Sequence, residues 1–123
     1  MGISKMCDGR YSIELNRNSK VMYLMVAGTF NNEKVAEFIR DYNSNVASVV
    51  ASEFVLEIDV TDMKVLTQDM IPQMQACHQL YRESGFKKVV FVTNGSALVQ
   101  SQMARVARMA DLKNVEFTQM ATK

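Results

Sequence analysis

Short apolar runs alternate with longer amphipathic segments along this chain, and this alternation restricts the fold more than any other feature. The strand-like runs cover residues 11–16, 21–26, 54–60, 89–92 and 115–120. The segments that separate the last four runs repeat apolar residues every three or four positions, as a helix with one buried face does. The order β-β-α-β-α-β-α-β predicts an α/β fold with a mixed, mainly parallel sheet packed by helices and joined by right-handed crossovers.

The strand-like runs differ in how they alternate. Residues 11–16 alternate apolar and polar side chains, and the polar residues 17–20 then connect them to residues 21–26 as a hairpin. The nearly continuous apolar run 21–26 predicts a strand buried on both faces. The β-branched run 89–92, which precedes the turn signal Asn94-Gly95, is the best candidate for a central strand.

Three helices are expected, each with a side-chain cap or a stop signal. Asn31 or Asn32 caps the first, whose apolar stripe runs from Val35 to Val50. A cap at Thr67 or Asp69 begins the second, and Asp69 agrees better with Pro72. The second stripe is Met70, Met74, Cys77 and Tyr81, and Gly85 ends that helix in the left-handed conformation. Ser96 caps the third, with a stripe of Val99, Met103, Val106 and Ala110.

The length and charge favour one soluble domain. We expect a single domain over residues 1–123, with residues 1–9 as a flexible N-terminal segment. A formal net charge of +1 argues against nucleic acid or an anionic membrane surface as a partner. There is no apolar run of about 18 residues and no signal-like N-terminus, and the cysteines, Cys7 and Cys77, lie far apart. A cytoplasmic protein is therefore expected.

Residues for catalysis or for binding a cofactor do not group in recognisable motifs. The Thr93–Ser96 turn could hold a small anion on its amides, but a plain strand-to-helix turn is favoured. His78 adjoins Cys77 on a predicted helix, where consecutive side chains diverge, so we expect a partly exposed histidine beside a buried structural cysteine. No cluster has the spacing of a zinc site. We expect no catalytic residue, no metal and no cofactor.

Carboxylates gather where the third strand-like run ends, at Glu57, Asp59, Asp62 and Asp69. Open α/β sheets bind ligands at the carboxyl ends of their strands, so these groups could hold a metal or act as acid and base. A solvated acidic rim with one helix cap is the favoured interpretation. Arg105, Arg108 and Lys113 are expected on the solvated face of the third helix.

The order of elements, with three matching segments, resembles the STAS domain, the fold of bacterial anti-sigma-factor antagonists and of the cytoplasmic tails of sulphate transporters. Residues 21–32 are similar to the family's second strand, with its glycine and polar turn into the first helix. Residues 54–63 are similar to the strand and acidic turn that precede its switch site. Residues 89–95 and 105–112 are similar to its later strand and third helix.

In the antagonists that this chain resembles, a serine at the start of the second helix is phosphorylated by a kinase that is also the binding partner. Thr67-Gln68-Asp69-Met70 stands at that place, with Gln68 at the serine. Gln68 cannot accept a phosphate, and Thr67, the candidate phosphorylation site, is offset by one position. The resemblance therefore implies partner docking without the usual serine switch.

A second group with the same fold, the lipid-associated STAS/SEC14-like proteins, also lacks the serine, and resemblance to it implies an apolar ligand between helices and sheet. The chain has 10 methionines, whose flexible side chains can line such a space. The candidate ligand residues are Met22, Met25, Met70, Met74, Met103 and Met109. Methionines on helix stripes are more often plain core residues, which is the favoured interpretation here.

The resulting hypothesis is a non-enzymatic, cytoplasmic, STAS-like regulatory module that binds a protein such as a regulatory kinase, with a homodimer as a further option. The predicted partner-binding residues are Asp59, Thr61, Asp62, Thr67, Gln68 and Asp69. The alternative is a carrier or sensor of a small, lipid-like apolar ligand. A small metal-dependent enzyme that uses Asp59, Asp62 or Asp69 is a third candidate.

Overall fold

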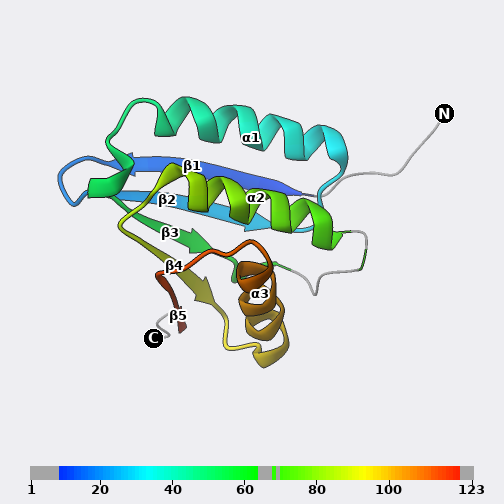
Figure 1. The fold of residues 1–123 in the computed structure, drawn as a ribbon. Coiled ribbons are helices and arrows are strands. Elements are labelled where there is room, and N and C mark those ends of the chain that lie inside the picture. Colours follow the sequence, from blue (N-terminus) through cyan, green and yellow to red (C-terminus); the bar gives the residue numbers. More distant parts are fainter. Residues whose placement is uncertain (1–8, 64–67, 69, 120–123) are drawn as a thin grey trace.

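The computed structural model describes residues 9–63, 68 and 70–119. The elements follow the predicted order (Figure 1). The strands are β1 (Arg10–Asn16), β2 (Val21–Ala27), β3 (Val55–Asp59), β4 (Lys88–Thr93) and β5 (Val115–Gln119). The helices are α1 (Asn32–Val46), α2 (Met70–Ser84) and α3 (Ala97–Met109), and the short 3-10 helix η1 (Ala51–Glu53) precedes β3.

The strands form one sheet in the order β1-β2-β3-β4-β5. β1 pairs with β2 antiparallel as the predicted hairpin, and the other three pairs are parallel. The prediction of a mixed, mainly parallel α/β sheet is confirmed. Because each right-handed crossover moves to the next strand in the same direction, all three helices lie on one face of the sheet (Figure 1).

The two faces of the sheet therefore have different environments. In β4, Val89 and Phe91 are buried under the helices, whereas Val90 and Val92 on the other face are half-buried. The expectation that residues 21–26 are buried on both faces is wrong, since Tyr23 is 37% exposed. No described helix covers that face, which we call the open face. An apolar run thus indicates a strand here but not how many of its faces are covered.

Helix α1 begins as predicted and ends earlier than predicted. The Asn31 side chain accepts a hydrogen bond from the Lys34 amide at 2.8 Å and so caps the helix. The expected stripe up to Val50 is wrong in its last turn, because the helix ends at Val46 and Val50 is 59% exposed. The amides of Ser48 and Val49 bond to carbonyls three residues earlier, so a tighter turn follows the helix and keeps the three-residue spacing.

The ends of α2 and α3 confirm two of the expected signals. Gly85 has a φ of +78°, the left-handed conformation that ends α2. The Ser96 hydroxyl accepts from the Val99 amide at 3.2 Å and caps α3, whose predicted stripe is buried. The expected caps Thr67 and Asp69 lie outside the described residues, as do Cys7, Met120 and, except for Gly9, the segment 1–9. Among the described helices, none has the length and hydrophobicity needed to cross a membrane.

Candidate functional site

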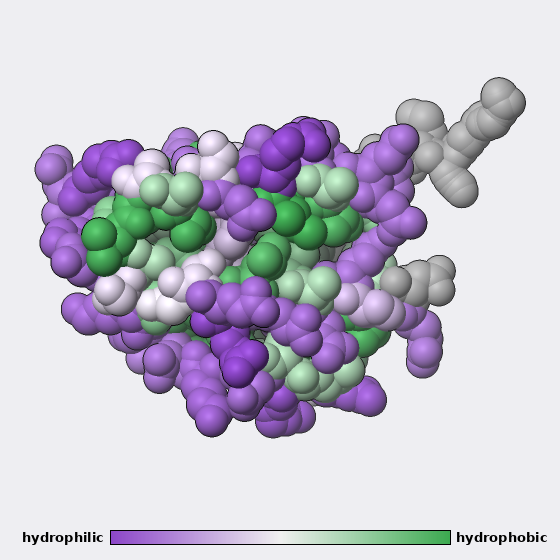
Figure 2. Space-filling view, turned by 45° about the horizontal axis from the view of Figure 1, so that its top comes forward, coloured by the Kyte–Doolittle hydropathy of each residue, from purple (hydrophilic) through white to green (hydrophobic). Residues whose placement is uncertain are grey.

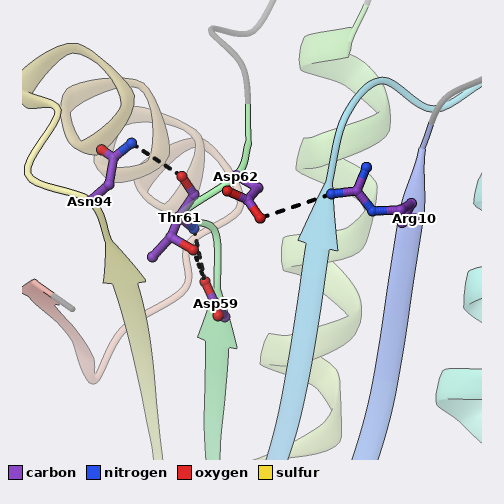
Figure 3. A network of polar contacts seen from close by, with 5 residues as sticks. All are labelled: Arg10, Asp59, Thr61, Asp62 and Asn94. Atoms are coloured by element: carbon purple, nitrogen blue, oxygen red, sulfur yellow. Dashed lines mark hydrogen bonds and ion pairs between the residues drawn. The ribbon is translucent and has the colours of Figure 1, made fainter. Parts of the chain in front are cut away.

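Polar residues meet at the end of the sheet where β3 and β4 finish, and we call this group the carboxyl edge. It consists of Arg10, Asp59, Thr61, Asp62 and Asn94 (Figure 3). Asp59 ends β3, Thr61 and Asp62 follow it, Asn94 follows β4, and Arg10 begins the antiparallel β1. Parallel strands bring their carboxyl ends to one edge, which is why residues more than 30 positions apart in sequence become neighbours here.

The Asp59 carboxylate makes its hydrogen bonds within the turn that follows β3. Its Oδ1 accepts from the Thr61 amide at 2.9 Å and from the Thr61 hydroxyl at 2.7 Å. These two bonds fix the chain as it leaves β3, and both groups are half-buried. Two of the predicted partner-binding residues therefore shape the edge from within, through Asp59 Oδ1 and the amide and hydroxyl of Thr61.

Asn94 connects the β3 exit to the β4 exit. Its Nδ2 donates to the Thr61 carbonyl at 3.1 Å, and its Oδ1 accepts from the Ser96 amide at 2.9 Å. The Gly95 amide donates to the Thr93 hydroxyl at 3.3 Å. Two amides that an anion would need are occupied, which supports the favoured interpretation of residues 93–96 as a plain turn.

Asp62 and Gln68 are the predicted residues that face solvent. Asp62 lies 3.9 Å from the Arg10 guanidinium as a loose ion pair, with 71% of its side chain exposed. Gln68 is exposed, and its carbonyl accepts from the Ile71 amide at 3.3 Å at the start of α2. Thr67, the candidate phosphorylation site, and Asp69 lie outside the described residues. Glu57 is inside β3 and not at the carboxyl edge.

A second feature is an interior space of about 40 Å³ between the helices and the sheet, which we call the helix–sheet cavity. Its floor includes Val26, Ile58 and Phe91 from three adjacent strands, and α2 supplies most of its roof. Figure 2 looks onto the helical side, where hydrophobic side chains reach the surface between polar ones. The partly buried apolar residues on α1 and α2 include Ile39, Val46, Met74 and Leu80.

The six candidate methionines divide between this cavity and other places. Met70, Met74 and Met103 line it, together with Met63. Met22 is fully buried in the core without lining it. Met25 is on the open face, because strand residues three apart point to opposite sides, and Met109 is 45% exposed on α3. The helix–sheet cavity is therefore lined by three of the six candidate ligand methionines.

His78 lies in the wall of the cavity, and the expectation of a partly exposed histidine is wrong. Its side chain is fully buried, and neither ring nitrogen has a hydrogen-bond partner in the described part of the chain. Its ring centroid lies 5.5 Å from that of Tyr81 and 5.3 Å from that of Phe91. Burial lowers the pKa of His78 to about 4, so the ring is neutral at pH 7.

The sequence contained a signal for this position. His78 follows Met74 by four residues and precedes Tyr81 by three, so it belongs to the same stripe as Cys77. A buried helix face is wide enough for both. Cys77 is buried as expected, and the loss of solvation raises the pKa of its thiol to about 11. The linking role of Asn94 had no signal beyond its turn-forming type.

Comparison with solved structures identifies the fold of the chain. No family model matches the chain, and no curated protein does so either. Among solved structures, the chain is similar to an uncharacterised protein of the DUF3478 family from Shewanella loihica, which is described as having a SpoIIAA-like fold. The TM-score is 0.64 at 20% identity, and the match covers 100% of this chain and 94% of the other. Likeness at this identity establishes the fold, which is the STAS-like one expected.

Proposed function

We propose, from the SpoIIAA-like fold of this chain, that it is a non-enzymatic regulatory module of the cytoplasm that docks a protein partner at its carboxyl edge. One observation supports this most: Asn94, Thr61 and Asp59 form a continuous set of hydrogen bonds between two loops. A surface that is ordered before binding loses less conformational entropy when a partner binds. The edge therefore has the rigidity that a docking surface needs.

Asp62 and Gln68 are the proposed contact residues. Both are exposed, and Arg10 is the described cation paired with Asp62, at a distance too long for a strong bond. A partner cation can replace Arg10 at little cost. Because Gln68 carries no hydroxyl, docking at this point is not controlled by phosphorylation of residue 68.

A pull-down with lysine variants tests the docking site. We expect Asp62→Lys to reduce recovery of the partner at least about tenfold, because it places a cation where the partner's cation binds. Gln68→Lys should also reduce recovery, because it replaces a neutral contact side chain with a long cationic one. Glu83→Lys is the matched control, since Glu83 is exposed near the opposite end of α2. If Asp62→Lys and Glu83→Lys retain the same partners equally, the carboxyl edge is not the docking site.

A second function is favoured by the helix–sheet cavity: a carrier or sensor of a small apolar ligand. Its walls are apolar apart from a few side chains, and methionines from α2, α3 and the β3 exit line it. Methionine side chains are unbranched and can move to admit a ligand. Native mass spectrometry of the purified protein, followed by solvent extraction, tests this function. A bound mass that disappears on extraction supports it, and an unliganded mass with an empty extract contradicts it.

A further inference from the structure

The two unpaired nitrogens of His78 set a chemical requirement on whatever fills the helix–sheet cavity. A buried polar group without a hydrogen bond destabilises the folded state, because the water it loses on burial is not replaced, and native proteins leave few such groups. His78 is fully buried, and Tyr81 and Phe91 present their rings to it. Neither nitrogen has a partner among the described residues, so His78 presents an unsatisfied donor and an unsatisfied acceptor in a mostly apolar wall.

The charge of the cavity wall limits the ligand further. Besides His78, the titratable groups in the wall are Cys77 and Tyr81, and no described lysine or arginine lines it. An ionised carboxylate or phosphate would thus enter without a counter-ion, at a large desolvation cost. Gln73 is the remaining polar side chain of the wall, and its Nε2 already donates to Asn32 Oδ1 at 3.0 Å. A neutral polar group is the one that this wall accepts.

The volume of the cavity sets the scale of the ligand. A space of about 40 Å³ holds a few atoms, so a ring or short chain needs some displacement of the lining side chains. Four methionines line the space, and a thioether chain changes rotamer at low cost. The ligand is therefore small, mostly apolar and uncharged.

We propose that the helix–sheet cavity binds a small apolar molecule with one hydroxyl group, an alcohol or a phenol, whose hydroxyl hydrogen-bonds to His78. A hydroxyl both donates and accepts, so it can satisfy either ring nitrogen. This proposal rests on the second function above, since it assumes that the cavity takes a ligand. It adds that His78 selects for the hydroxyl.

The test compares phenol with benzene, which has the same ring without the hydroxyl, for the wild type and His78→Phe. Affinities come from titrations followed by NMR. We expect the ratio of phenol affinity to benzene affinity to fall about five- to tenfold in His78→Phe, because the variant retains an aromatic side chain and loses the hydrogen bond. Gln79→Met is the control, because Gln79 is exposed on α2 next to His78 and does not line the cavity, so this variant should keep the wild-type ratio.

The imidazole supplies a second readout, because His78 is the only histidine in the sequence. Phenol, but not benzene, should shift the ¹⁵N resonance of one ring nitrogen of the wild-type protein. An unchanged affinity ratio in His78→Phe, with both compounds bound, overturns the hydroxyl proposal and leaves the apolar-ligand function standing. Binding of neither compound to the wild type overturns both.

Discussion

At the scale of single residues, His78 has the environment least usual for its type. Imidazole normally titrates near neutral pH, but here it is buried against aromatic rings, and no described residue hydrogen-bonds to either nitrogen. Although we predicted a partly exposed histidine at position 78, the apolar spacing of α2 includes this position on the buried face. It could not indicate that the nitrogens lack partners, because that depends on side chains from β4 and α1 that meet α2 only in the folded molecule.

Acid should destabilise the protein through His78. Its pKa is lowered from 6.5 to about 4 by burial, so between these values the unfolded chain binds a proton that the folded chain does not. The free energy of unfolding should fall as the pH drops through this window, by about 3 kcal/mol in total.

Urea unfolding of the wild type and His78→Phe from pH 7.5 to 4 checks this. The difference between the two curves isolates the imidazole, since other groups titrate in both proteins. The variant should be at least as stable at pH 7.5 and should gain relative stability toward pH 4. Parallel curves would show that His78 is solvated in the folded state.

Cys77 gives a second prediction at this scale. Desolvation raises the pKa of the thiol to about 11, so little reactive thiolate exists at pH 8. In a Cys7→Ser background, iodoacetamide should modify the folded protein at least about 100-fold more slowly than the urea-unfolded protein. Mass spectrometry of timed samples measures both rates. Similar rates would mean that α2 opens readily.

At the scale of elements, the sequence predicted which helices and strands are present, and in what order, better than it predicted the residues at which they end. Asn31, Ser96 and Gly85 act as the caps and stop that their residue types indicate. The end of α1 was misplaced because Val46, Val49 and Val50 continue the apolar spacing beyond the helix. A tight turn and a helix share a three-residue spacing, so only the backbone bonds distinguish them.

One side chain joins α1 to the first strand. The Tyr11 hydroxyl donates to Glu37 Oε2 at 3.0 Å or to Asp41 Oδ2, and its ring lies 5.3 Å from that of Phe38. Burial, and then the hydrogen bonds to the two carboxylates, raise the pKa of Tyr11 well above its ordinary value. The hydroxyl therefore remains a donor at neutral pH, between two like charges one helical turn apart.

Tyr11→Phe should lower the free energy of unfolding by about 1 kcal/mol, because it removes this donor and leaves the two carboxylates to repel each other. Tyr23→Phe is the control, since it makes the same change on the open face. Urea unfolding of both variants measures the effect. An equal loss in the two would remove the proposed role of the Tyr11 hydroxyl.

At the scale of the whole molecule, the strand order determines which surfaces are free. The sequence predicted right-handed crossovers, but the number of covered faces depends on the order of the strands. In a consecutive order, every crossover helix lies on the same face. This explains why the apolar run 21–26 was assigned two buried faces and has one. The carboxyl edge was predictable because it depends on strand direction, whereas the cavity depends on how side chains from six elements fit.

Two adjacent valines in β4 test this two-layer arrangement. Val89 is 2% exposed beneath the helices, and Val90 is half-buried on the open face. Threonine has nearly the shape of valine and adds one hydroxyl, so the substitution reports on access to water. Val89→Thr should lower the free energy of unfolding by about 1–3 kcal/mol, because its hydroxyl is buried among apolar side chains.

Val90→Thr should change the free energy of unfolding by no more than about 0.5 kcal/mol, because its hydroxyl can reach water. Urea unfolding at pH 7.5 compares the two variants. A large loss in both would mean that the open face is covered in solution. The measurement is then repeated at several protein concentrations. If the loss of free energy of unfolding in Val90→Thr grows with concentration, a second copy of the chain covers the open face.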